Sequence, residues 1–217
     1  MNTPNNRSIM KKIIIVLLTG ISLTFGSQAA FAEEDVFALD EHCLAYKTEK
    51  SMFFFAGIEV IGKSCDVQAE IHWQDSEEQA QVEVSVPVSS FDSGNSLRDG
   101  DIPEILRGEL TPDIRFTSTW LSRTDMQKMF KNGNAEVSGM LEVAGNTFPV
   151  KFTLTFRDQG RYFLIAGKLI TSFSGLKVEV PTVGPGGMLA EPSDYLELLV
   201  HLRSDKISGT EKIAVLN

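Results

Sequence analysis

The side chains that could carry chemistry are few and lie far apart in the sequence. The three histidines, His42, His72 and His201, form no HxH or HxxxH pattern, so their spacing predicts no metal site. We interpret His72 as a surface residue, and the alternation around His201 places it on the exposed face of a strand. The sequence has no GxSxG elbow and no glycine loop that binds phosphate. We therefore expect no enzyme, because a hydrolase would need a histidine and a carboxylate to converge in one cavity.

Cys43 and Cys65 are the only two cysteines of the chain. In an oxidising compartment such a pair favours a disulfide, and two reduced core thiols are the alternative. If the first hairpin turned near Ala56 and Gly57, the two cysteines would not face each other. A bridge would then need a bulge or an offset in the strand pairing.

The first 32 residues have the three parts of a secretory signal. Basic residues at positions 7, 11 and 12 precede a largely apolar run over 13–25, and the small residues Ala30 and Ala32 follow. The run is shorter than the roughly 20 residues that a membrane-spanning helix needs. We expect a signal peptide over 1–32, cleaved after Ala32, and a periplasmic protein.

The charge of the remaining chain excludes some partners. The leader holds three of the 20 basic residues and none of the 29 acidic ones, which leaves a net charge of −12 on residues 33–217. Nucleic acid needs a basic surface, so we expect no nucleic-acid binding. An anionic membrane surface would also repel this chain. Transient contact with a membrane stays open, and the sequence does not choose between a monomer and a homodimer.

Residues 33–217 alternate between apolar and polar types, which is typical of strands with one buried face. The clearest runs lie at 82–89, 114–120, 150–156 and 196–202, and Ala144-Gly145-Asn146 is a hairpin signal between two runs. We expect one all-β domain over 33–217, a single extended antiparallel barrel of about eight strands with one or two short helices in loops. A two-sheet sandwich is the alternative. Segments 122–134 and 183–192 are expected to be long loops, and the tail from Ser204 is expected to fray.

Three segments carry recognisable motifs: VPVSSFDSGNSLRD at 86–99, TPDIRFTST at 111–119 and VSGMLEVAGNTFPVKF at 137–152. In residue types and in order along the chain, they resemble the YceI-like family of exported polyisoprenoid-binding proteins. The resemblance implies a lipocalin-like barrel with a long interior cavity for an isoprenoid chain, such as a quinone tail or a polyprenyl lipid. One departure is Asp101-Ile102, where the family often has a histidine after Arg-Asp.

The aromatic composition agrees with such a cavity, because 14 phenylalanines outnumber the tyrosines and tryptophans together. We expect a binding protein that carries or stores an isoprenoid lipid, with no cofactor, no metal and no catalysis. A filled barrel that acts on a protein partner through the loops 122–134 and 183–192 is the alternative. The alternation predicts ligand-binding side chains at Phe53, Phe55, Val84, Val86, Phe116, Trp120, Leu141, Phe152, Leu154 and Leu198.

Overall fold

The structure is a computed structural model that describes residues 36–52, 55–180 and 191–213. Its described part confirms the all-β fold class, with ten strands where about eight were expected. The strands are β1 (Cys43–Met52), β2 (Phe55–Ser64), β3 (Gln68–Trp73), β4 (Gln79–Pro87), β5 (Asp113–Ser118), β6 (Leu121–Ser122), β7 (Asn134–Val143), β8 (Asn146–Asp158), β9 (Phe163–Thr171) and β10 (Glu191–Arg203). The helices are α1 (Ser96–Ile105) and α2 (Arg123–Asn132), and short 3-10 turns lie at Val88–Ser90, Ser174–Leu176, Ser204–Lys206 and Thr210–Lys212.

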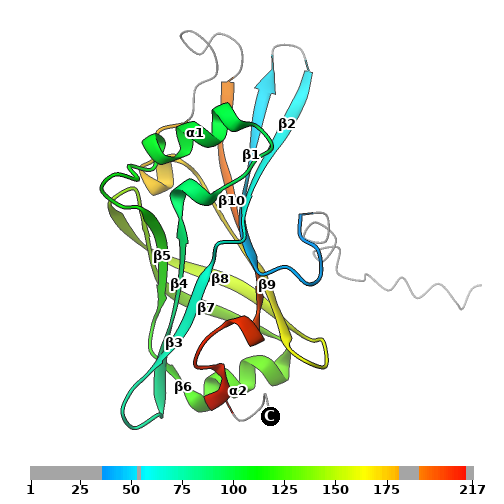
Figure 1. The fold of residues 1–217 in the computed structure, drawn as a ribbon, viewed down its shortest axis with the longest axis vertical. Coiled ribbons are helices and arrows are strands. Elements are labelled where there is room, and N and C mark those ends of the chain that lie inside the picture. The colour runs from blue at the N-terminus through cyan, green and yellow to red at the C-terminus, as the bar shows by residue number, and fades with distance from the viewer. Residues whose placement is uncertain (1–35, 53–54, 181–190, 214–217) are drawn as a thin grey trace, which may run out of the picture. The chain divides into compact units, whose positions relative to one another are not determined.

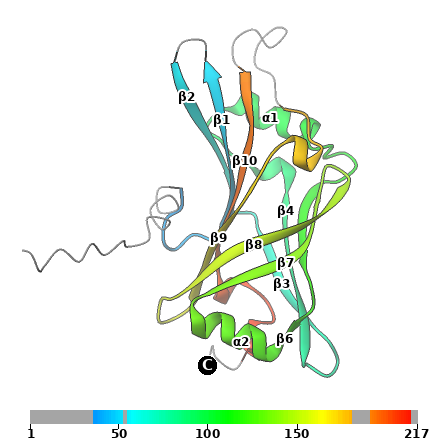
Figure 2. The same cartoon turned by 180° about the vertical axis from the view of Figure 1, so that it is seen from behind.

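All the strands belong to one antiparallel sheet that curls into a half-barrel (Figure 1). The order of neighbours is β2-β1-β10-β9-β8-β7-β5-β4-β3, and β6 pairs with β4. The last strand, β10, lies between β1 and β9, as the view from behind shows (Figure 2). Most other neighbours follow each other in the chain, which is the meander that the hairpin signals predicted.

The alternation of residue types decides which side chains face the inside of the curl. On β7, Val137 and Leu141 are buried while Met140 is exposed, and on β8 Phe152 is buried while Thr153 is exposed. A pleated strand sends successive side chains to opposite faces, so this pattern gives each strand one apolar inner face.

The hairpin between β7 and β8 forms where the sequence predicted it. Val143 pairs with Asn146, and the two residues between them, Ala144 and Gly145, have φ values of 51° and 74°. A two-residue type I′ turn requires positive φ at both positions, and glycine meets this requirement without strain.

Strands β2 and β3 lie at the two ends of the sheet order. Hydrogen bonds connect the end of β2 with the segment that follows β4, the neighbour of β3. The backbones of Lys63 and Asp92 exchange two hydrogen bonds of 2.8 and 2.9 Å. The hydroxyls of Ser64 and Ser90 lie 2.6 Å apart. These contacts close the curl at the end of β2, while the rest of β2 is an edge strand.

The C-terminal segment corrects the expectation of a frayed tail. Ser208 pairs with β3, because Ile71 N donates to Ser208 O at 2.8 Å and Ser208 N donates to Ala69 O at 3.1 Å. Ile207 and Ile213 are buried. The sequence looks polar here, but two isoleucines are enough to anchor the segment against the inside of the sheet.

Most of segment 122–134 is helix α2, one of the short helices that were expected within loops. Ser122 caps the helix by accepting a hydrogen bond of 3.0 Å from Asp125 N, and Gly133 ends it in the left-handed conformation. Met126 and Phe130 are buried on its inner side. Helix α2 and the C-terminal turns therefore close one end of the half-barrel (Figures 1 and 2). Of the second predicted loop, 183–190 lies outside the described residues, and 191–192 begin β10.

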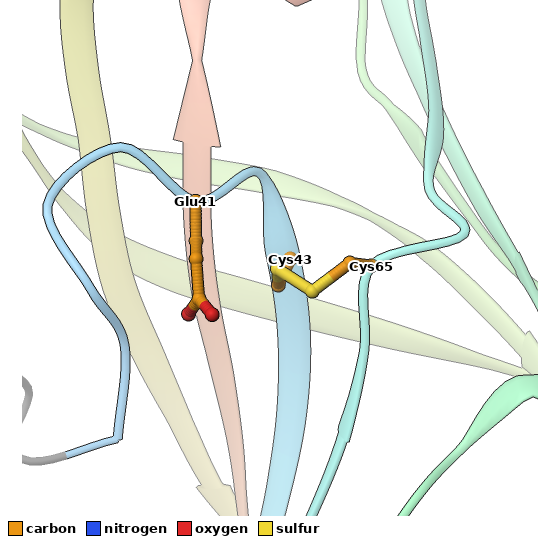
Figure 3. A group of neighbouring side chains, drawn as sticks. All are labelled: Glu41, Cys43 and Cys65. Atoms are coloured by element: carbon orange, nitrogen blue, oxygen red, sulfur yellow. A yellow bond between two sulfur atoms is a disulfide. The ribbon is translucent and has the colours of Figure 1, made fainter.

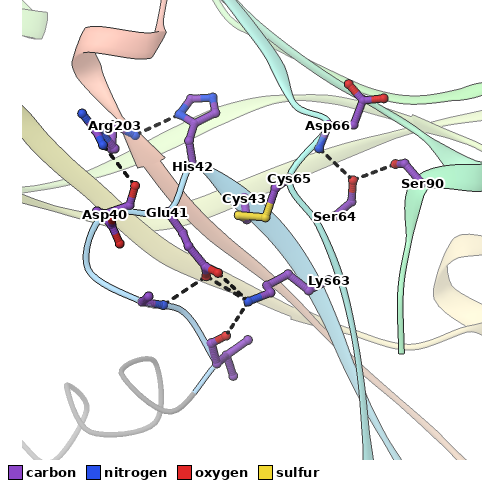
Figure 4. The surroundings of a disulfide bond; sticks show 12 residues. Asp40, Glu41, His42, Cys43, Lys63, Ser64, Cys65, Asp66, Ser90 and Arg203 are labelled. Carbon is purple, nitrogen blue, oxygen red and sulfur yellow. Dashed lines mark hydrogen bonds and ion pairs between the residues drawn. A yellow bond between two sulfur atoms is a disulfide. The ribbon is translucent and has the colours of Figure 1, made fainter. Parts of the chain in front are cut away.

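Cys43 and Cys65 form a disulfide with an S–S distance of 1.98 Å. The bond ties the start of β1 to the link between β2 and β3, beside the hydrogen bonds of Ser64 (Figure 4). The first hairpin pairs Met52 with Phe55, ahead of Ala56 and Gly57, and the register shifts between Lys50 and Met52, which is the kind of offset that a bridge was expected to need. That shift brings the two cysteines into line.

Candidate ligand cavity

The inner faces of the strands enclose a cavity of about 510 Å³. Its size lies within the range of small-molecule binding sites in proteins. Nearly all of its lining side chains are aliphatic or aromatic, so the cavity suits a hydrocarbon better than water. A filled barrel, which the alternative function required, is therefore not what the described residues form.

The closed end of the cavity consists of one cluster of buried side chains. Phe130 of α2 packs edge-to-face against Phe156 and Phe163, with ring centroids 4.9 and 5.1 Å apart. Ile207 and Ile213 from the C-terminal segment belong to the same cluster. Each such aromatic pair stabilises the folded state by about 0.5–1.5 kcal/mol beyond the effect of burying its surface area. These contacts therefore keep this end of the cavity closed.

The middle of the cavity is shaped by rings that lie against glycines. On β7, a Cβ atom added at Gly139 would stand 2.5 Å from Phe116 Cε2. The Phe116 ring therefore occupies the place of a side chain at Gly139 and packs edge-to-face on Phe152, with centroids 5.4 Å apart. Tyr46 occupies the corresponding place at Gly62 of β2, and burial raises the pKa of its phenol.

Helix α1 lies over the other end of the cavity, which we call the mouth (Figure 1). Asn95 caps the helix by accepting hydrogen bonds from Leu97 N at 3.1 Å and Arg98 N at 3.3 Å. Ile102 is buried beneath the helix, and Ile105 also lines the cavity.

The charged side chains of the cavity lining also come from α1. Within the described lining, Arg98 is the one cation and Asp101 the one carboxylate. The Arg98 guanidinium is held in place by Ser93, to whose Oγ its Nε donates at 2.7 Å and to whose carbonyl its Nη2 donates at 2.9 Å. Ser93 in turn donates from its hydroxyl to Asp99. A guanidinium has five N–H donors, so this arrangement orients the group and leaves donors for a ligand.

Seven of the ten predicted ligand-binding residues line this cavity: Val84, Val86, Phe116, Leu141, Phe152, Leu154 and Leu198. Their role in binding stays a prediction. The side chains of Phe53 and Phe55 lie outside the described residues.

Trp120 does not line the cavity and is 49% exposed, so its expected position was wrong. Strand β5 ends at Ser118 and β6 begins at Leu121, and Leu121 points inward instead. A bend between two strands shifts the alternation by one residue, and the sequence pattern alone does not reveal the shift.

The sequence reasoning missed most lining residues outside the strands. They come from α1, from α2 and from the turn after β9, and include Ile102, Ile105, Leu106, Met126, Phe130, Phe173 and Leu176. The apolar residues at 102, 105 and 106 have the spacing of a helix face and could have been recognised. Nothing in the sequence shows that this helix covers a barrel.

The described histidines do not serve a site in the cavity, because none of them is among its lining residues. The expectation for His201 was wrong, since it is 4% exposed and stacks on Phe37 with centroids 4.8 Å apart. It lies on the outer face of β10, where the segment before β1 covers it. The convergence of histidine and carboxylate that a hydrolase would need does not occur in the described cavity.

One group of potential metal ligands exists in the described chain, Glu41 with Cys43 and Cys65 (Figure 3). The two sulfur atoms are bonded to each other. The Glu41 carboxylate accepts hydrogen bonds of 2.8 and 2.9 Å from Lys63 Nζ (Figure 4). A metal would need free thiolates. Instead, the disulfide and the ion pair between Glu41 and Lys63 hold the start of β1 and the segment before it in place. None of the described helices is both long enough and apolar enough to cross a membrane.

An antiparallel half-barrel around an apolar cavity defines a lipocalin-like protein. The sequence profile of the YceI-like domain matches residues 39–184, so the chain belongs to the YceI-like family. No curated protein matches the chain.

Solved structures with the same fold include BcnA of Burkholderia cenocepacia, at 16% identity and a TM-score of 0.56, covering 74% of this chain and 95% of that one. The YCEI protein of Campylobacter jejuni is similar at 16% identity and a TM-score of 0.53, covering 70% and 88%. A polyisoprenoid-binding domain from Saccharophagus degradans is similar at 11% identity and a TM-score of 0.51, covering 74% and 92%. At these identities the likeness concerns the fold.

Proposed function

We propose that the protein binds one isoprenoid lipid non-covalently in this cavity, and carries or stores it without catalysing a reaction. The observation that carries the proposal is an apolar cavity of about 510 Å³ with its charged lining residues at one end. Each methylene that leaves water for such a cavity stabilises the complex by about 0.8 kcal/mol, so a long chain binds without hydrogen bonds. The polyisoprenoid-binding domain of Saccharophagus degradans, which shares the fold, supports this choice of ligand.

The position of Arg98 suggests how the lipid is oriented. The hydrocarbon chain lies among the phenylalanines, and the head group lies at the mouth beside α1. A quinone carbonyl and a prenyl phosphate both offer oxygen acceptors, which Arg98 can bind with its remaining N–H groups. The proposed ligand is therefore a quinone-type or polyprenyl lipid with an oxygen-bearing head.

The proposed location is the periplasm, reached through cleavage after Ala32. The leader lies outside the described residues, so its sequence pattern alone supports this part of the proposal. N-terminal sequencing of protein from an osmotic-shock fraction tests it. A mature chain that begins at Glu33 supports export, and an intact leader in the cytoplasm contradicts it.

Mass spectrometry of an organic-solvent extract tests the ligand. The protein is purified from its native compartment without detergent, and a folded variant with a blocked cavity, Leu198→Trp, is purified in parallel. We expect about one isoprenoid per wild-type chain and far less in the variant. The absence of lipid from the wild type, together with no uptake of added isoprenoids, would overturn the proposal.

A further inference from the structure

Three large exposed apolar side chains lie on α1, in the turn after it and on β2, and we call Ile58, Leu97 and Leu110 the rim. Leu97 of α1 is 82% exposed although it also lines the cavity. Leu110 follows the same helix and is 80% exposed. Ile58 of β2 is 49% exposed and lies two residues before Val60, which lines the cavity. Residues two apart share one face of a strand, so Ile58 continues the inner face beyond the cavity.

Two of the three rim residues are continuous with the apolar interior, because Leu97 lines the cavity and Ile58 follows the inner face of β2 from Val60. Single exposed residues such as Ile170 on β9 are ordinary on protein surfaces. Figures 1 and 2 show α1 at the same end of the sheet as the far ends of β1 and β2.

The charges near the rim select the kind of partner. The segment that contains α1 and the following turn carries Asp99, Asp101, Glu104 and Glu109 against Arg98 and Arg107. A surface of this charge is repelled by anionic lipids, and apolar residues insert into the interface of a bilayer whose head groups have no net charge.

We propose that the rim inserts into the surface of a zwitterionic bilayer, so that the ligand passes directly between the bilayer and the cavity. This inference rests on the proposed lipid binding. An isoprenoid chain that crossed water would expose every methylene to it, which is unfavourable, and contact between mouth and bilayer avoids this exposure.

The test measures transfer of an anthraniloyl-labelled geranylgeraniol from the mature protein to phosphatidylcholine vesicles by stopped-flow fluorescence. Transfer by contact gives a rate that rises in proportion to vesicle concentration. Ile58→Ser and Leu110→Ser together should lower that slope by about tenfold, a change of about 1.4 kcal/mol, because both apolar side chains are removed from the rim. Neither residue lines the cavity, so probe affinity without vesicles should stay unchanged.

The matched control is the double variant Ile170→Ser and Leu39→Ser, whose residues are 57% and 61% exposed and are not among the lining residues of the cavity. It should transfer as the wild type does. A rate independent of vesicle concentration, or an equal loss in the control, would overturn the inference. The inference would also be overturned if the rim only joined two copies of the chain. In that case the wild type would sediment as a dimer, and the rim variant would sediment as a monomer and transfer the probe at the wild-type rate.

Flotation of unloaded protein with the same vesicles separates this inference from the proposed function. Flotation that the rim variant loses and the control keeps supports the membrane face even if the probe fails to bind. If the protein binds the probe but does not float, and its transfer rate does not depend on vesicle concentration, the proposed lipid binding stands and the insertion of the rim into a bilayer is refuted.

Discussion

Tyr46 lies across Gly62 on the neighbouring strand, and a Cβ atom added at Gly62 would stand 2.2 Å from Cε1 of the tyrosine ring. The two residues pair directly between β1 and β2, and the ring lines the cavity. The glycine is therefore needed for space on the inner face.

We predict that Gly62→Ala forces the Tyr46 ring into the cavity. The free energy of unfolding should fall by about 1–3 kcal/mol, as it does when a methyl group is forced into a packed site. Gly100→Ala is the control, since nothing lies within 4 Å of a Cβ at that helical position. Urea unfolding measures both variants, and equal stability of Gly62→Ala and the wild type would contradict the contact.

Phe152→Lys should abolish lipid retention, because an ammonium group in an apolar cavity loses its hydration without gaining a partner. Thr153→Lys places the same charge on the exposed face of β8 and should retain the lipid. Lipid per chain is measured by mass spectrometry after both proteins are shown to be folded by circular dichroism. A folded Phe152→Lys protein that keeps its lipid would remove Phe152 from the binding site.

Arg98→Gln separates recognition of the head group from burial of the chain. Hydrogen bonds to a charged group contribute about 1.5–3 kcal/mol, so affinity for a polyprenyl phosphate or a quinone should fall roughly 10- to 100-fold. Affinity for squalene, which has no oxygen, should not change. Arg107→Gln is the control, since Arg107 is exposed and does not line the cavity. Equal losses for squalene and the oxygen-bearing lipids would mean that Arg98 supports only the fold of α1.

Replacing Cys43 and Cys65 together by alanine removes a crosslink between residues 22 positions apart. The chain-entropy relation predicts a loss of about 3 kcal/mol in the free energy of unfolding. For a domain of this size the melting temperature should fall by roughly 10 °C. A dithiol reductant should lower the melting temperature of the wild type in the same way and leave the variant unchanged. If the reductant also lowered the melting temperature of the variant, its effect on the wild type could not be assigned to the Cys43–Cys65 disulfide.

Stability should decrease at acid pH because of two covered histidines. Burial lowers the pKa of His201 and of His42 below the ordinary value of 6.5, and for His201 the backbone at Leu39 and the nearby Glu41 only partly offset this effect. The unfolded chain therefore binds protons more readily, so this stability is complete above about pH 6.5 and is lost as the pH falls below that value.

His201→Phe tests this pH dependence, since it keeps a ring against Phe37 and removes the titrating group. The unfolding free energy, measured by urea between pH 5 and 8, should fall less steeply toward acid in this variant. His72→Gln is the control, because the His72 side chain is 49% exposed. An unchanged slope in His201→Phe would assign the acid sensitivity to other groups.

Local patterns in the sequence determined the strands and much of the cavity. Alternation is a property of neighbouring residues, and it placed Phe116, Leu141 and Phe152 on inner faces. The Ala144-Gly145 turn was equally predictable, because its positive φ values are a local requirement.

Only the tertiary structure decided how those faces meet. Trp120 is exposed because the chain bends between β5 and β6, and His201 is covered because Phe37, from the segment before β1, packs over it. Contacts between residues far apart in the chain place helix α1 over the mouth of the cavity and the C-terminal segment at its closed end. Such contacts depend on the strand register and on which sheet edges come together. A shift of one residue at a bend moves the side chains of the following strand to the opposite face. The sequence by itself therefore determined an apolar inner surface, and tertiary packing determined that this surface encloses a cavity whose charged lining residues, Arg98 and Asp101, both come from α1.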